Sequence, residues 1–312
     1  EQALTIAREI GDQRGEGSRL GNLGGAYAEL GETRKAIEYH EQALEISREI
    51  EDRRGEGADL GNLGNRCAEL GETRKAIEYY EQALKISREI GDQRGESAHL
   101  GNLGNRYAEL GETRTAIEYH EQALVISREI GDRWGEGADL GNLGLAYADL
   151  GETRKAIEYY EQALAIAREI GDRRNEGEFL CNLGKAYLDL NEPDKTIDYC
   201  TQSRDLARKI EYRMFEAEAL YTLGRAFTTC GDLPQALDHC DQALKIFKEI
   251  EYPCGEAGAL FAKSLALDRL DRRLQAVACA EEALQIFQKI ENHQAKKVHR
   301  QLEAWQPSEQ ES

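Results

Sequence analysis

The sequence predicts an all-α protein that is built as a solenoid of stacked helix pairs. The forty residues Gly55–Arg94 recur as Gly95–Trp134 with differences at only eight positions, and such self-similarity is the mark of a repeat architecture. Within each copy, apolar residues recur at intervals of three and four, which is the spacing of one face of a helix. The 312 residues include only 4 Pro, below the usual share of roughly 5%. These observations predict long tandem helices that must stack to bury their apolar faces.

The repeat divides the chain into four parts. Residues 1–14 match the end of a repeat and are expected to form the second helix of a truncated one. Seven tandem repeats of 40 residues follow over 15–294, starting at Gly15, Gly55, Gly95, Gly135, Asn175, Phe215 and Gly255. Residues 295–305 are predicted to form a capping helix over the exposed apolar end, as solenoids require. The last residues, 306–312, are expected to be a disordered tail.

Each repeat is predicted to hold two helices with a short turn between them. In the first repeat, Leu20, Leu23 and Tyr27 share one face of the first helix, and Gly31 can end that helix in a left-handed conformation. Five second helices are followed by an Asp that can cap the next first helix, namely Asp12, Asp52, Asp92, Asp132 and Asp172.

Two glycines recur inside the first helix, at Gly21 and Gly24 in the first repeat. A glycine inside a helix costs about 1 kcal/mol relative to alanine. Their recurrence therefore suggests close helix approach, since only a missing side chain admits a neighbouring backbone. Inheritance through duplication of the repeat is the alternative explanation.

The composition argues against nucleic-acid and membrane partners. The chain has 40 Lys+Arg and 59 Asp+Glu, a net charge of −19, whereas binding to a phosphate backbone needs a basic surface. No apolar run approaches the roughly 18 residues that span a bilayer. The 7 Cys form no C-x-x-C pair and favour reduced thiols in a cytoplasmic protein.

No pattern in the sequence predicts catalysis, a cofactor or a metal site. His40 and His120 occupy a repeat position that holds tyrosine in two other repeats, and neither a metal ligand nor a catalytic base would be exchanged for tyrosine. A packing role is therefore predicted for both. The glycine-rich segment GEGSRLG has one residue too many for a dinucleotide-binding loop and no strand before it. We therefore predict that the chain is not an enzyme and needs no cofactor.

The repeat resembles the tetratricopeptide repeat. Its signature positions hold Leu20, Leu23, Gly24, Tyr27, Ala36 and Ala43, although the usual tryptophan of the first helix is leucine here and the closing proline is absent. The forty-residue length and the segment LGNLGNRYAELG are similar to the long repeats of kinesin light chain and of Pins-type cell-polarity adaptors. The resemblance implies a right-handed α-α superhelical solenoid whose first helices line a concave groove, and a scaffold that holds peptides or partner domains.

With the groove of that family as a guide, a ladder of polar residues predicts a peptide-binding surface. An asparagine side chain both donates and accepts, so it can pair with a peptide bond whatever side chain that residue carries. Hydrogen bonds from these asparagines to neighbouring helices are the alternative. The predicted groove residues are Asn22, Asn62, Asn65, Asn102, Asn105, Asn142, Asn182, Lys185, Tyr221 and Arg225.

Two cations in the C-terminal half of the groove suggest what it binds. Lys185 and Arg225 occupy the same position in adjacent repeats, with Asn182 one turn before Lys185. Together they could make charge-assisted hydrogen bonds to a carboxylate of the partner. Glu178 and Glu218 lie on the same helices and could instead neutralise both cations.

Larger side chains also enter the groove from the fifth repeat onward, namely Phe179, Cys181, Tyr221 and Phe261. Aromatic residues contribute strongly to interfaces, but a better-filled core is the alternative.

The sequence thus predicts a protein–protein interaction scaffold with a protein or peptide ligand. Two alternatives stay open. The chain could be the sensor arm of a larger signalling ATPase or protease, or a structural spacer that associates with itself end to end.

Overall fold

The computed structural model describes residues 2–305, and those residues form α-helices joined by short turns. The predicted tail, 306–312, lies outside the described residues. The chain divides into two compact units, the N-terminal unit (Glu1–Glu152) and the C-terminal unit (Thr153–Ser312).

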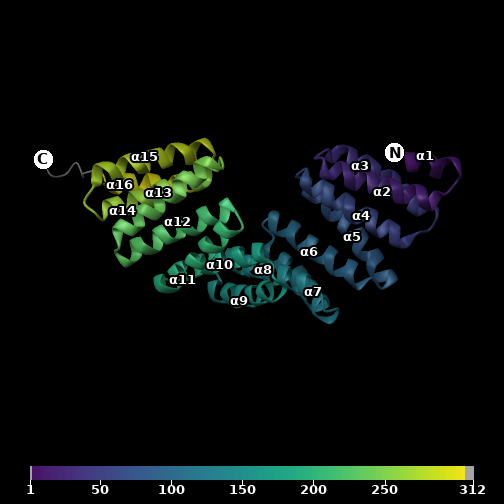
Figure 1. Cartoon of the computed structure of the whole chain (residues 1–312), viewed down its shortest axis with the longest axis horizontal. Coiled ribbons are helices and arrows are strands. Elements are labelled where there is room, and N and C mark those ends of the chain that lie inside the picture. Colours follow the sequence, from purple (N-terminus) through teal and green to yellow (C-terminus); the bar gives the residue numbers. More distant parts are fainter. Residues whose placement is uncertain (1, 306–312) are drawn as a thin grey trace. The chain divides into compact units, whose positions relative to one another are not determined.

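Figure 1 labels the helices of both units. The N-terminal unit contains α1 (Gln2–Glu9), α2 (Gln13–Glu29), α3 (Thr33–Glu49), α4 (Arg53–Glu69), α5 (Thr73–Ile90), α6 (Gln93–Glu109), α7 (Thr113–Glu129) and α8 (Arg133–Asp149). The C-terminal unit contains α9 (Thr153–Ile170), α10 (Arg173–Asp189), α11 (Pro193–Lys209), α12 (Arg213–Cys230), α13 (Leu233–Glu249), α14 (Pro253–Asp268), α15 (Arg273–Lys289) and α16 (Ala295–Trp305).

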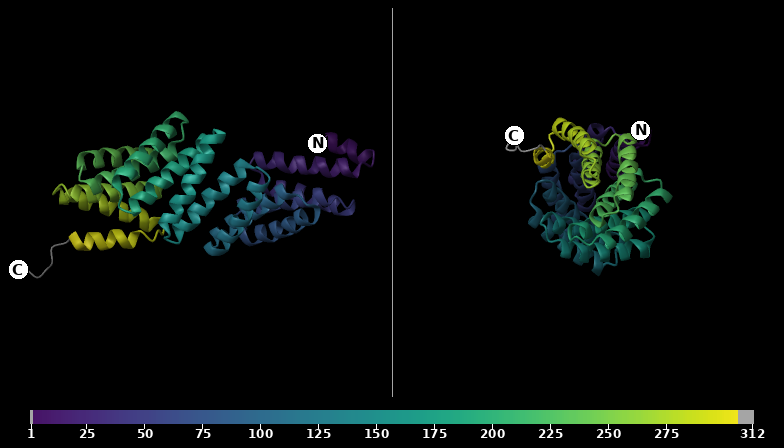
Figure 2. Two further views of the ribbon diagram at one scale, coloured as in Figure 1. Left: turned by 90° about the horizontal axis from the view of Figure 1, so that it is seen from below. Right: turned by 90° about the vertical axis from the view of Figure 1, so that its left-hand side faces the viewer.

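Within each unit, every helix packs against its neighbours along the chain (Figures 1 and 2). The first helices of successive repeats also contact one another, as α4 contacts α6 in one unit and α10 contacts α12 in the other. No two second helices pack as extensively. In each unit the first helices therefore form a closely packed layer, and the second helices form a more widely spaced outer layer. The predicted all-α class of tandem helix pairs is confirmed.

Local chain chemistry sets the helix ends as predicted. Gly31 has φ +76°, in the left-handed region that ends a helix without strain only for glycine. Glu51 adopts the same conformation with φ +55° at the end of α3, where other repeats have glycine. The Asp12 carboxylate accepts a hydrogen bond from the backbone N–H of Gly15 at 2.9 Å, which caps α2.

The Gly24 position is a site of close helix approach, as predicted, but the approaching group is a side chain and not a backbone. A Cβ built on Gly24 would lie 2.6 Å from the His40 ring, and one on Gly64 would lie 2.6 Å from the Tyr80 ring. In the C-terminal unit, a Cβ built on Gly184 would lie closer still to the Sγ of Cys200. The missing side chain therefore makes room for a large group buried between the two helices of a repeat.

Buried glutamates join consecutive repeats, a feature that the apolar pattern did not indicate. Glu56 is buried in α4, where it accepts from Arg48 Nε of the preceding helix at 2.9 Å and also from Arg53. The same arrangement recurs at Glu136, Glu176 and Glu216. Burial opposes ionisation, but the hydrogen bonds from its two arginines lower the pKa of Glu176 below the ordinary value. The recurring separation of eight residues between Arg and Glu was the available sequence signal.

The Gly64 contact predicts opposite effects for two glycine-to-alanine substitutions. Gly64→Ala forces a methyl group against the Tyr80 ring and should lower the free energy of unfolding by roughly 1–3 kcal/mol. Gly25→Ala adds a methyl group where nothing lies within 4 Å, and should raise it by about 0.5–1 kcal/mol through helix propensity. Denaturant unfolding of both variants checks this, and equal effects of the same sign would contradict the packing role of Gly64.

Asp59 predicts a pH-dependent stability. It is 8% exposed, accepts from Ser47 Oγ at 2.9 Å, and burial raises its pKa to about 6. Above about pH 6 the carboxyl of the folded protein is ionised in a buried site that disfavours charge, which lowers the stability. Below about pH 4 the carboxyl is protonated in both the folded and the unfolded state, so this cost disappears. Asp59→Asn, which keeps the acceptor for Ser47, should therefore stabilise the protein by roughly 2 kcal/mol at pH 8.

This gain should shrink as the pH falls from about 6 to about 4. Thermal melts across that range measure it. Asp149→Asn, at an exposed position of the same unit, is the control and should change stability little. A gain at Asp59 that does not depend on pH would contradict an ionised buried carboxylate.

Candidate functional site

The predicted asparagine ladder lies on the first helices. In the N-terminal unit, Asn22 is exposed on α2, while Asn62, Asn102 and Asn142 are half-buried on α4, α6 and α8. Asn182 is half-buried on α10 of the C-terminal unit. No side-chain hydrogen bond joins any of these five amides to another of the residues 2–305. Their donors and acceptors therefore remain open to solvent or to a partner.

A pocket in the N-terminal unit gathers three of the predicted residues. It has a volume of about 320 Å³ between α4 and α6, and Asn62, Asn65 and Asn102 line it. Arg54 and His99 are also part of its wall. Polar groups that converge on one hollow of this size are typical of a binding site.

Asn65 differs from the other predicted residues. Its Oδ1 accepts a hydrogen bond from Tyr80 Oη at 2.6 Å, inside the repeat. Burial raises the pKa of Tyr80 to about 12, so its phenol keeps the proton that it donates. The Asn65 carbonyl is therefore hydrogen-bonded to a neighbouring helix, α5, which was the alternative to peptide binding. Asn105, at the same repeat position, is half-buried and makes no such bond within the described chain.

The two cations of the predicted carboxylate clamp have different neighbours in the structure. Lys185 Nζ lies 2.8 Å from Glu218 Oε2, which is the neutralising ion pair considered above. Arg225 instead lines a pocket of about 350 Å³ between α12, α14 and α16, and Lys297 of α16 lies in the same pocket. Glu218, the partner of Lys185, also lines this pocket.

This C-terminal pocket combines aromatic rings with cations. Tyr221, Tyr252 and Phe261 line it, together with Arg225 and Lys297. The Arg225 guanidinium lies 5.6 Å from the centre of the Tyr221 ring, and Lys297 Nζ lies 6.0 Å from that of Phe261. Neither cation forms an ion pair with any of the residues 2–305. The pocket can therefore take an apolar or aromatic group that carries a negative charge.

The larger side chains of the later repeats fall into two groups. Phe179 and Cys181 are buried and fill the core, whereas Tyr221 and Phe261 are half-buried and line the C-terminal pocket. The contribution of Lys297 was not predicted, because the helix 295–305 was expected only to cap the apolar end of the solenoid.

Trp134 is an exposed aromatic residue that the groove positions did not predict. It is 65% exposed at the start of α8. The residues at the equivalent position of two other repeats line pockets, Arg54 in the N-terminal unit and Cys254 in the C-terminal unit. An aromatic residue in a position that is otherwise mostly arginine was the available signal.

The histidines have the predicted packing role. His40 and His120 are both buried against glycines of the preceding helix, and burial lowers the pKa of His40 to about 4. Nowhere in residues 2–305 do three or more His, Cys, Asp or Glu side chains gather so as to hold a metal ion. No helix of that part of the chain is both long and apolar enough to cross a membrane.

Comparison with known proteins identifies the repeat. A family model described as tetratricopeptide repeat matches six overlapping stretches, namely residues 1–49, 20–89, 57–129, 95–169, 138–209 and 175–249. No curated protein sequence matches the chain significantly.

Solved structures with the same fold include three of different kinds. A signal transduction ATPase with a tetratricopeptide repeat sensor, from Pyrococcus horikoshii, is 19% identical with a TM-score of 0.78, and the match covers 97% of this chain and 46% of that one. A Rap protein complexed with Competence and Sporulation Factor is 14% identical with a TM-score of 0.59, over 96% of this chain and 98% of that one. A putative kinesin light chain from Podosopora anserina is 21% identical with a TM-score of 0.53, over 62% and 96%. At these identities the similarity is one of fold.

Proposed function

Because the chain belongs to the tetratricopeptide repeat family, we propose that it is a non-catalytic cytoplasmic scaffold that holds an extended peptide or a partner domain against its first helices. One observation carries the proposal: in both units, a pocket that contains predicted groove residues opens between first helices. Nucleic acid and membranes are not among the proposed partners.

In the N-terminal unit, the open amides of Asn62 and Asn102 support binding to a peptide backbone. They lie one repeat apart in the same pocket and make no hydrogen bond within the described chain. An extended peptide presents a donor and an acceptor at each residue, which matches a series of amides along stacked helices.

In the C-terminal unit, the pocket of Arg225 and Lys297 supports a preference for an acidic partner. The rings of Tyr221 and Phe261 supply apolar contact area, and the two cations are free to pair with a carboxylate. A segment with an acidic residue next to an apolar or aromatic one fits both features. Lys185 takes no part in this proposal, since it is paired with Glu218.

Two other functions belong to the same architecture. The likeness to the repeat sensor of the Pyrococcus horikoshii ATPase supports a sensor arm in a larger signalling protein, which would hold its partner by the same surface. A spacer that associates end to end would not need the pockets. Sedimentation velocity over a range of concentrations tests the spacer, which requires larger species at higher concentration.

The scaffold is tested by capture of partners with the intact protein, followed by titration of peptides from the captured protein. Arg225→Ala together with Lys297→Ala should weaken binding of an acidic peptide by about tenfold or more, because hydrogen bonds to charged groups contribute about 1.5–3 kcal/mol each. Isothermal calorimetry measures the loss.

The matched control is Lys245→Ala together with Lys289→Ala, which removes the same charge from the second helices α13 and α15. This control should bind like the unmodified protein and melt at the same temperature. Equal weakening in the two double variants would indicate a general charge effect, and normal binding in the pocket variant would exclude the pocket as the site.

A further inference from the structure

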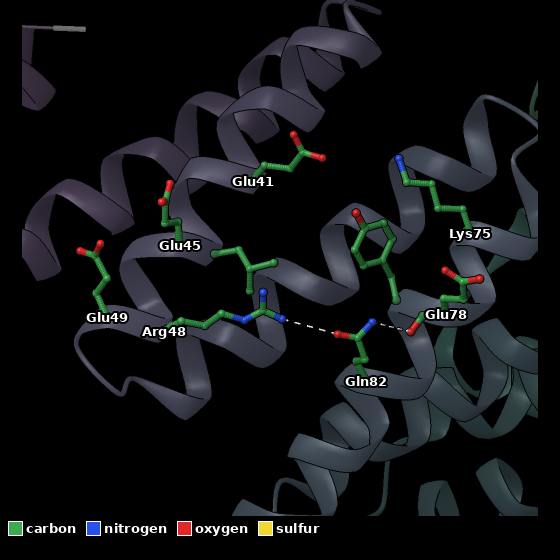
Figure 3. A pocket seen from close by; sticks show the side chains of 9 residues that line it. Glu41, Glu45, Arg48, Glu49, Lys75, Glu78 and Gln82 are labelled. Carbon is green, nitrogen blue, oxygen red and sulfur yellow. Dashed lines mark hydrogen bonds between the residues drawn. The ribbon is translucent and has the colours of Figure 1, made fainter.

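A separate pocket of about 750 Å³ lies in the outer layer of the N-terminal unit, between the second helices α3 and α5. Glu41, Glu45 and Glu49 follow one another along α3, and Glu78 lies opposite on α5, with Leu44 and Tyr79 also in the lining (Figure 3). We call this the outer pocket. It shares no residue with the two pockets of the first helices.

The charge of the outer pocket is largely unneutralised. The two cations in its lining have partners. Arg48 pairs with the buried Glu56 and donates to Gln82, the second of which is drawn in Figure 3. Lys75 Nζ lies 3.8 Å from Glu72 and 5.9 Å from the centre of the Tyr79 ring. None of the four carboxylates makes a hydrogen bond or an ion pair within residues 2–305. A cation that enters would therefore meet four carboxylates without displacing an existing ion pair.

The outer pocket lies where one repeat lacks an aromatic ring. In three other repeats, a tyrosine of the first helix stacks on a tyrosine of the second, with ring centres 5.2 to 5.4 Å apart. The second repeat has Cys67 at that first-helix position. Tyr79 consequently has no ring stacked on it in the described chain, and it lines the pocket instead.

The geometry of a later repeat indicates where the missing ring would lie. Tyr187 Oη donates to Glu161 Oε1 at 3.2 Å, over a separation of 26 residues. Position 67 likewise follows Glu41 by 26 residues, and Glu41 lies in the wall of the outer pocket. A tyrosine at position 67 would therefore reach toward Glu41 and occupy part of the pocket.

We propose that the outer pocket binds a basic segment of a second protein partner, with an arginine or lysine side chain over the Tyr79 ring and its charge among Glu41, Glu45, Glu49 and Glu78. Lys75 Nζ already lies 5.9 Å from the centre of the Tyr79 ring, and an aromatic ring next to carboxylates is a favourable site for a further cation. Charge complementarity selects this occupant, since an acidic or a purely apolar segment would leave the four carboxylates unpaired and desolvated. The volume exceeds that of one side chain, so more than one basic residue can enter.

The test uses a labelled tetra-arginine peptide and the full chain at physiological ionic strength, where long-range attraction to a protein of net charge −19 is screened. The unmodified protein should bind it saturably at one dominant site. Cys67→Tyr changes no charge and introduces the residue type that the third repeat has at the equivalent position, Tyr107. It should weaken binding by about tenfold, while the melting temperature stays equal or rises.

A second variant does not depend on how well a ring fits at position 67. Glu45→Lys introduces the residue type that the second repeat has at the equivalent position, Lys85. Position 45 is exposed in the pocket wall. It should weaken binding by about tenfold or more, whereas Glu281→Lys, an equal charge change on the exposed surface of α15, should leave it within about twofold. Equal weakening by the two lysine variants, or undiminished binding by a folded Cys67→Tyr, would overturn the proposal.

Discussion

The helix pair of most repeats depends on one contact, between a glycine of the first helix and the side chain sixteen residues further along the chain. At Gly64 and Gly184 the missing Cβ leaves room for Tyr80 and for the Cys200 sulfur. A side chain on the glycine would push the two helices apart, because protein interiors are packed too densely to absorb an extra methyl group without strain. The apolar faces that remain on each pair are then buried by stacking the next repeat against it.

Charge has a structural role between repeats and a different one at the surface. Each buried glutamate, such as Glu56, is held by arginines from two helices. A buried carboxylate is strongly destabilising unless it is paired, so these contacts disfavour any other register of one repeat on the next. They also engage many of the basic residues, which leaves the outer pocket with carboxylates that have no partner.

The two layers of helices therefore offer different chemistry. The first helices present open amides and, in the C-terminal unit, two cations over aromatic rings. The second helices of the N-terminal unit present an acidic hollow whose position follows from one substitution, Cys67. A tandem array can acquire a site in this way, because a change in one copy of the repeat leaves the packing rules of the others intact.

The sequence by itself determined the repeat, the helix pairs and their ends, because periodicity, glycine and aspartate act within a few residues of the chain. It also indicated the close approach at Gly24 and the packing role of His40. Only the tertiary structure decided that Asn65 is held by Tyr80, that Lys185 pairs with Glu218, and that Lys297 joins Arg225 in one pocket. These outcomes depend on which side chains from different helices come within hydrogen-bonding or ion-pair distance, and the spacing along one helix does not contain that information.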